Sequence, residues 1–208
     1  MSEIRRRNPG EIEAESFRII EKELGPVSFS KKEFAILRRM IHATGDFEFA
    51  KTVRFHPQAI ESGLKALGNG GNILVDVRMA AAGISHQLLE KRGGRVICHI
   101  DDPRAAELAG AHNITRSEAA VELASDENIG IAVIGNAPTA LLKVMDLLNN
   151  NHPGFKPGLV IGVPVGFVNA AESKELLAIA EYPFITSLGR KGGTPVAVAI
   201  VNALLRLA

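Results

Sequence analysis

The chain has 208 residues with 24 basic and 23 acidic side chains, and a formal net charge of +1 creates no field that demands a nucleic-acid partner. It contains no Trp and one Tyr, which argues against base-stacking platforms, and its one cysteine, Cys98, excludes an internal disulfide and fits a reducing cytosol. Since no apolar run approaches the roughly 20 residues of a membrane span, and Arg5-Arg6-Arg7 leads into a turn, we expect a soluble cytoplasmic protein with no membrane partner.

Two helices are predicted in the first fifty residues. The turn signal at Asn8-Pro9-Gly10 opens a helix over 11–24, which Gly25-Pro26 ends. Ser30-Lys31-Lys32-Glu33 has the Ser-x-x-Glu form of a capping box, and it opens a helix from Lys31 to about Ala43.

From residue 55 onward, predicted helices and strands alternate. Strands are expected at 72–76, 95–100, 129–134, 158–163 and 184–187, and helices at 58–67, 85–91, 115–124, 138–148, 172–180 and 195–207, with a short helix or turn at 105–110. This alternation favours right-handed βαβ units, and therefore an α/β fold with three layers and a mainly parallel sheet flanked by helices. No repeat or long linker divides the chain. We expect one domain over 1–208, with N-terminal helices in 1–50 and the sheet region in 55–208.

The run Ile129 to Ile134 is short, apolar and rich in β-branched residues, which suits a strand buried on both faces of a parallel sheet. Gly135-Asn136 then breaks the strand, and Pro138 fits the first turn of the helix that follows. Such a connection leaves backbone N–H groups and a positive dipole end at the carboxyl edge of the sheet, where they favour an anion. An ordinary strand-to-helix connection explains the stretch equally well.

Other candidate sites are limited by what the sequence lacks. Glycine turns at 135–136, 164–166 and 189–193 are expected together at the carboxyl edge, yet none of them carries a nucleotide-binding fingerprint. Six histidines are present, but none stands at a metal-ligand spacing from a second ligand, so no metal site is expected.

His42 differs from the other histidines because it lies in the last turn of the helix predicted from Lys31. The helix dipole favours an imidazolium there, which makes His42 a candidate acid, although a simple C-terminal capping histidine fits the same pattern. Arg116 stands at a helix start and Arg190 within a glycine turn. Each position suits either a nearby anion or a solvated arginine.

Five segments carry a family resemblance: 40–45 (MIHATG), 113–117 (NITRS), 135–141 (GNAPTAL), 162–174 (GVPVGFVNAAESK) and 189–193 (GRKGG). Together they resemble the precorrin-8X methylmutase family, the precorrin isomerases of cobalamin biosynthesis, which include the cobalt-precorrin-8 enzymes. The resemblance runs from Ser16-Phe17 to the final helix.

The resemblance implies a homodimeric α/β isomerase that moves a methyl group from C-11 to C-12 of precorrin-8X or cobalt-precorrin-8, giving hydrogenobyrinate or cobyrinate without a cofactor. The catalytic histidine of the family falls on His42. Substrate binding is implied for Ser16, Thr44, Thr115, Arg116, Asn136 and Arg190. The chemistry agrees, because a methyl shift without redox change needs only a proton on the conjugated ring, and an imidazolium can supply it. The many carboxylates of the substrate suit arginines and glycine turns.

Two other interpretations stay open. A non-catalytic corrinoid carrier needs the same anion-binding cleft but not His42, and another anion-binding α/β protein is disfavoured by the missing fingerprints. Metal-free and cobalt substrates fit equally well, because the metal sits in the macrocycle and requires no protein ligand.

Overall fold

A six-stranded sheet, in the order β1-β6-β5-β4-β2-β3, forms the centre of the computed structural model. The structure describes residues 8–208, so Arg5-Arg6-Arg7 lies outside the described residues. The strands are β1 (Val53–Phe55), β2 (Asn72–Val75), β3 (Val96–Ile97), β4 (Ile129–Ile134), β5 (Leu159–Gly162) and β6 (Phe184–Ser187). Strands β2 to β6 run parallel and β1 pairs antiparallel with β6 at one edge, which confirms the mainly parallel sheet.

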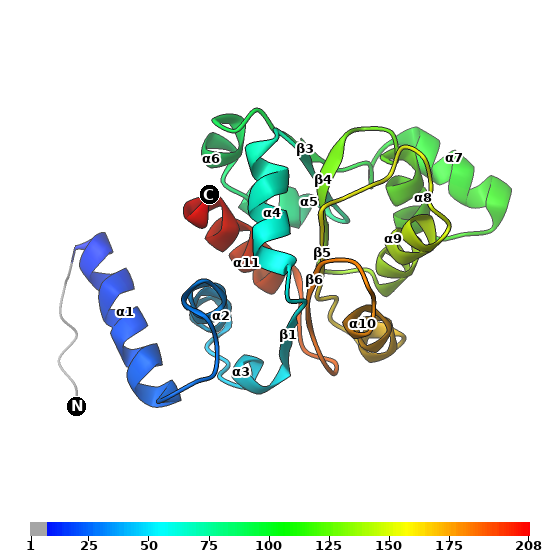
Figure 1. The fold of residues 1–208 in the computed structure, drawn as a ribbon. Helices are drawn as coiled ribbons and strands as arrows, with labels where there is room; N and C mark the ends of the chain where they lie inside the picture. The colour runs from blue at the N-terminus through cyan, green and yellow to red at the C-terminus, as the bar shows by residue number, and fades with distance from the viewer. Residues whose placement is uncertain (1–7) are drawn as a thin grey trace.

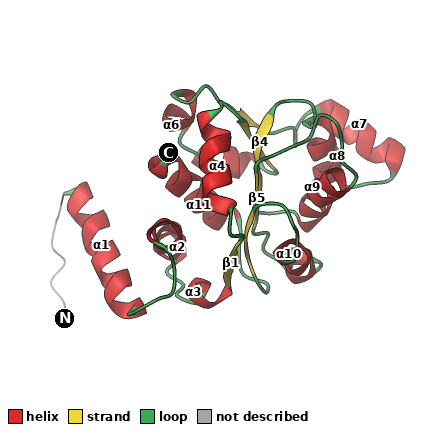
Figure 2. Cartoon of the chain, in the orientation of Figure 1, coloured by secondary structure: helices red, strands yellow, loops and turns green. Residues whose placement is uncertain are grey.

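Helices cover both faces of this sheet (Figure 1). On one face lie α2 (Lys31–Thr44), α4 (Ala59–Gly68), α5 (Arg78–Gly83), α6 (His86–Glu90) and α11 (Thr194–Leu207), with α1 (Pro9–Leu24) outside α2. On the other face lie α8 (Arg116–Leu123), α9 (Pro138–Asn149) and α10 (Ala170–Ala178), with α7 (Pro103–His112) packed on α8. Figure 2 shows the resulting three layers, with short strands between two sets of helices.

Strand β4 belongs to both halves of the core. Ile131 and Val133 belong to the cluster on the α11 side, whereas Ala132 and Ile134 belong to the cluster on the α9 side, and all four side chains are inaccessible to solvent. Alternate residues of a strand point to opposite faces, so a run without polar residues is needed when helices cover both sides. The prediction of a strand buried on both faces is confirmed.

Three elements were not expected from the sequence: α3 (Phe49–Thr52), β1 and α5. Strand β1 is only three residues long and exists because Val53 and Phe55 pair with Ser187 and Ile185 of β6. The strand predicted over 95–100 is reduced to Val96–Ile97, because only those residues pair with β2. Cys98 therefore follows the strand, and it is partly exposed.

The strand order places a topological switch between β2 and β4. The chain proceeds from β4 through β5 to β6 in one direction across the sheet, and from β2 to β3 in the other. Ligands of open α/β sheets bind at the carboxyl ends of strands beside such a switch. Among residues 8–208, no helix is both long and apolar enough to span a membrane.

Candidate active site

His42 lies exposed in the last turn of α2. The capping box of Ser30 and Glu33 opens this helix, and Gly45, in the left-handed conformation at φ 68°, ends it by donating its N–H to the Ile41 carbonyl. The His42 ring packs edge-on against Phe17 of α1, with 5.4 Å between the ring centroids.

A pocket of about 330 Å³ opens beside His42, between α2 and α11. Its lining consists of Arg39, His42, Ala43, Pro195, Val198, Ala199, Asn202 and Arg206. Arg39 forms an ion pair with Glu13, whereas Arg206 forms none with the residues that the structure describes. The pocket thus places an imidazole, an unpaired guanidinium and apolar side chains around one small space.

The glycine turns after β4, β5 and β6 meet at the carboxyl edge, as predicted. The N–H of Gly193 donates to the Val163 carbonyl at 2.7 Å, and the N–H of Gly166 donates to the Arg190 carbonyl at 3.3 Å. Gly135 lies so close to α11 that a Cβ atom there would be 3.0 Å from the Cα of Thr194. These contacts hold the three turns in one surface.

Lys191 joins this surface to the end of α2. Its ammonium lies 2.6 Å from carboxylate oxygens of both Asp46 and Glu48. The hydrogen bond from Lys191 holds the pKa of Asp46 below its usual range, and the two carboxylates raise the pKa of Lys191. The charge of Lys191 is thereby neutralised by the protein.

Arg190 and Arg116 keep unneutralised charges at the same edge. The Arg190 guanidinium lies 5.4 Å from the ring centroid of exposed Phe167, and Arg116 is the exposed first residue of α8. Neither forms an ion pair with any of residues 8–208. Because the α8 dipole disfavours a cation at this end, a negatively charged ligand at Arg116 would relieve an unfavourable interaction.

The three predicted hydroxyl groups are bonded locally. Ser16 donates to the Ile12 carbonyl at 2.8 Å and Thr44 to the Met40 carbonyl at 2.9 Å, each within its own helix. Thr115 caps α8 through a capping box with Glu118 and lies 2.9 Å from the hydroxyl of Thr139. On α1 it is Phe17, the neighbour of Ser16, that contacts His42.

The turn after β4 corrects one expectation. Asn136 is exposed at the carboxyl edge, but the backbone N–H groups of Gly135, Asn136 and Ala137 are not free for a ligand. All three donate to the carboxylate of Asp76, which directly follows β2. Burial raises the pKa of Asp76, while the three N–H groups act in the opposite direction.

The sequence does not predict three residues of this region as site residues: Asp76, Lys174 and Arg206. The Lys174 side chain is inaccessible to solvent, and its ammonium donates to the Lys191 carbonyl at 2.7 Å within the last glycine turn. Burial lowers the pKa of Lys174 to about 8. The position of Asp76 at a strand end was the available signal, since carboxyl ends of neighbouring strands meet at one edge.

The predicted residues fall into two groups rather than one. His42 and Thr44 lie on α2, on one side of the sheet, whereas Thr115, Arg116 and Asn136 lie around the starts of α8 and α9. Arg190 lies in the glycine turn between β6 and α11. Within residues 8–208, no group of three or more His, Cys, Asp or Glu side chains is arranged to hold a metal ion.

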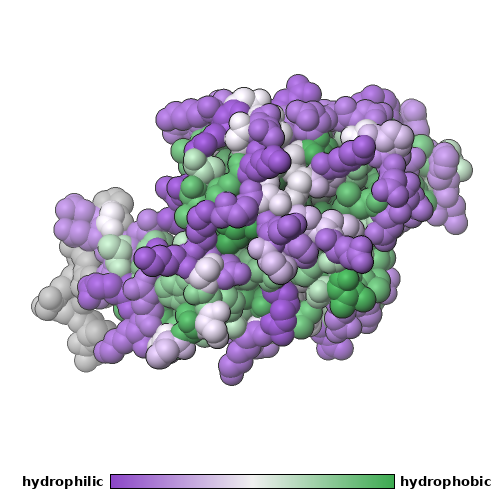
Figure 3. Space-filling model, in the orientation of Figure 1, coloured by the Kyte–Doolittle hydropathy of each residue, from purple (hydrophilic) through white to green (hydrophobic). Residues whose placement is uncertain are grey.

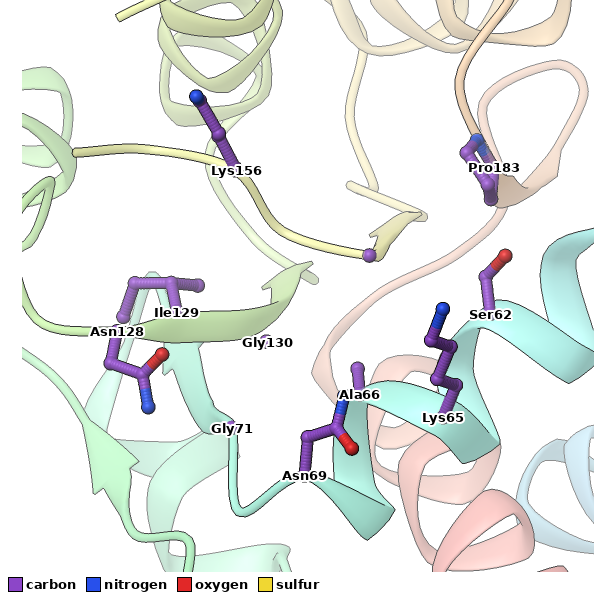
Figure 4. A pocket seen from close by; sticks show the side chains of 11 residues that line it. Ser62, Lys65, Ala66, Asn69, Gly71, Asn128, Ile129, Gly130, Lys156 and Pro183 are labelled. Carbon is purple, nitrogen blue, oxygen red and sulfur yellow. The ribbon is translucent and has the colours of Figure 1, made fainter. Parts of the chain in front are cut away.

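A second pocket, of about 400 Å³, lies at the opposite, amino edge of the sheet (Figure 4). The backbones of Gly71 and Gly130 form part of its wall, and Lys65 of α4 stands at its margin. None of the predicted site residues lines it. The carboxyl edge, where the predicted residues lie, is therefore the better candidate for the active site.

Comparison with known proteins gives one consistent result. The family model described as precorrin-8X methylmutase matches residues 11–207. A cobalt-precorrin-8 methylmutase of Priestia megaterium is 46% identical over 201 residues, covering 96% of this chain and 88% of the relative. A precorrin-8X methylmutase of a Sinorhizobium species is 40% identical, covering 96% and 95%. The solved structure of precorrin-8X methyl mutase from Thermus thermophilus superposes with a TM-score of 0.85 at 44% identity, covering 95% of both chains.

Proposed function

This chain belongs to the precorrin-8X methylmutase family, and on that premise we propose that it is an isomerase of cobalamin biosynthesis. It moves a methyl group from C-11 to C-12 of precorrin-8X or cobalt-precorrin-8, giving hydrogenobyrinate or cobyrinate. The observation that carries the proposal is the exposed imidazole of His42 at the negative end of α2. It lies beside a pocket that also contains the guanidinium of Arg206, which has no ion-pair partner among the described residues.

In the proposed mechanism, His42 acts first as a general acid and then as a general base. The imidazolium gives a proton to the conjugated ring system, the methyl group migrates to the neighbouring carbon, and the imidazole takes a proton back. Substrate and product are isomers, so the enzyme returns to its starting state without an oxidant or reductant. An imidazole suits both steps, because the same ring can give a proton and then take one back.

The acetate and propionate side chains of the substrate would be bound by charges that the protein leaves unpaired. Arg116 and Arg190 are exposed at the carboxyl edge and have no ion-pair partner among the described residues. Charge-assisted hydrogen bonds to carboxylates are stronger than neutral ones, so a few such contacts can orient the macrocycle. Thr44, Thr115, Asn136 and Ser16 complete the set of proposed substrate-binding residues.

We also propose that the active protein is a homodimer. The pocket beside His42 has about 330 Å³, near the lower end of the roughly 300–1,000 Å³ that drug-sized ligands occupy, and a corrin macrocycle exceeds that class in size. A second copy of the chain would enclose the part of the macrocycle that this pocket cannot hold. A dimer interface would also bury exposed apolar side chains: Phe167 and Val168 at the carboxyl edge, Leu176 on α10 and Ile179 directly after it, where Figure 3 shows hydrophobic colour.

The proposal includes a cytoplasmic location, which the single cysteine of the chain supports, since a disulfide-free chain suits a reducing compartment.

Sedimentation equilibrium tests the proposed homodimer, and a result that shows only monomer at micromolar concentration would contradict it. The sedimentation experiment and the spectral assay described next both use the full chain.

A corrinoid carrier is the competing function, because it requires the same anion-binding surface. The two functions differ in the fate of the ligand. When the protein is mixed with precorrin-8X, an isomerase changes the absorption spectrum with time until it matches the rearranged corrin, whereas a carrier gives a bound spectrum that stays constant. A parallel assay with cobalt-precorrin-8 identifies which substrate turns over faster.

A further inference from the structure

Three consecutive backbone N–H groups converge on one buried carboxylate at the switch point of the sheet. Asp76 is 1% exposed, and its Oδ1 accepts from Gly135 at 3.2 Å while its Oδ2 accepts from Asn136 and Ala137, each at 2.7 Å. Successive N–H groups of this kind form a concave anion-binding nest. In this protein, the side chain of Asp76, the residue directly after the neighbouring strand β2, fills the nest.

The same turn connects to groups at the start of α8. Helix α9 begins at Pro138, directly after the nest, and the hydroxyl of Thr139 in its first turn lies 2.9 Å from that of Thr115. Arg116 is the next residue after Thr115. On its other side the turn rests on α11, where a Cβ on Gly135 would lie 2.9 Å from the Cβ of Ala197.

We infer that Asp76 is a positioning residue: its carboxylate fixes the 135–137 turn and thereby sets where Asn136, Thr115 and Arg116 meet the substrate. The inference rests on the proposed function for the role of those residues. It also explains why the switch point is no site for a ligand carboxylate, since Asp76, directly after β2, already supplies that anion.

Two substitutions of Asp76 remove different numbers of its hydrogen bonds to the 135–137 turn. In Asp76→Asn the amide oxygen can still accept from Asn136 and Ala137, but the amide nitrogen then faces the N–H of Gly135, so one of three hydrogen bonds is lost. Asp76→Ala loses all three. Asp102→Ala is the matched control, because Asp102 also accepts from a backbone N–H, at the start of α7.

The measurement is binding of hydrogenobyrinate by absorbance titration, together with the Tm of each variant. We expect the dissociation constant to rise about tenfold or more in Asp76→Ala, the change that about 1.4 kcal/mol produces, and by less in Asp76→Asn. The control should bind as the wild type does. A lowered Tm with unchanged product affinity in both variants, or a failure of both to fold, would assign Asp76 to stability alone and overturn the inference.

Formate provides a test that involves no corrinoid. Added to Asp76→Ala, it should enter the vacated nest, shift the amide NMR resonances of Gly135, Asn136 and Ala137, and restore part of the Tm, with no such effect in the wild type. Amide resonances that do not shift when formate is added to Asp76→Ala would contradict the inference. Failure of the wild type to bind either hydrogenobyrinate or cobyrinate would instead contradict the proposed function, so the two failures are distinguishable.

Discussion

Replacement of His42 by Ala separates the catalytic role of the imidazole from its packing. The side chain is exposed, and among residues 8–208 its only ring contact is the edge-on pair with Phe17 at 5.4 Å. Such a pair contributes about 0.5–1.5 kcal/mol. For a chain of this length, a loss of about 1 kcal/mol lowers Tm by about 2–4 °C. His42→Ala should therefore fold and remain stable.

The rate should fall far more than the stability. A positioned general acid and base contributes about 10²–10⁴-fold, so single-turnover conversion of precorrin-8X should slow by that factor, while binding of hydrogenobyrinate stays close to the wild-type value. The imidazole acts on the ring during migration, and the carboxylates that fix the ligand are bound elsewhere in the proposed site. The assay follows absorbance after mixing excess enzyme with substrate.

Two control variants isolate the effect. His112→Ala removes another exposed histidine from the last turn of a helix, α7, and should leave the rate unchanged. Phe17→Leu removes the ring contact but keeps the imidazole, so it tests whether packing on α1 matters for turnover. Wild-type single-turnover rates in purified His42→Ala would refute the assigned role, whatever the outcome for stability.

Three further results are expected. Arg116→Ala should weaken hydrogenobyrinate binding by about 10–150-fold, from the loss of about 1.5–3 kcal/mol, with a smaller fall in steady-state rate; equal dissociation constants by titration would exclude a direct contact. Burial lowers the pKa of Lys174 to about 8 from 10.5, so the free energy of unfolding of the wild type, relative to that of Lys174→Met, should rise as pH rises from 8 to 10.5. This gain should disappear again as pH falls back to 8, which thermal unfolding across this range checks. Gly162→Ala should cost about 1–3 kcal/mol in urea unfolding, since its Cβ would lie 2.8 Å from buried Leu141, whereas Gly110→Ala, with open space around it, should not destabilise.

The sequence by itself determined the layered α/β fold and the order of nearly all its elements. The run 129–134 has no polar residue, which suits only a strand covered on both faces, and the capping boxes at Ser30 and Thr115 mark helix starts through contacts three residues apart. Such signals are local, so they can be read before the chain is folded. The position of His42 at a helix end is local in the same sense.

Tertiary structure decided which charges and N–H groups remain available. In sequence, Lys191 and Arg190 are neighbours with equal charge, but only Lys191 reaches Asp46 and Glu48, more than 140 positions away in the chain. From the sequence, the N–H groups after β4 are expected to be free for a ligand. In the folded chain they donate to Asp76, about 60 positions earlier. Strand β1 likewise depends on pairing with β6. These pairings join distant segments, so no local pattern encodes them, and they decide which residues at the carboxyl edge can meet a substrate.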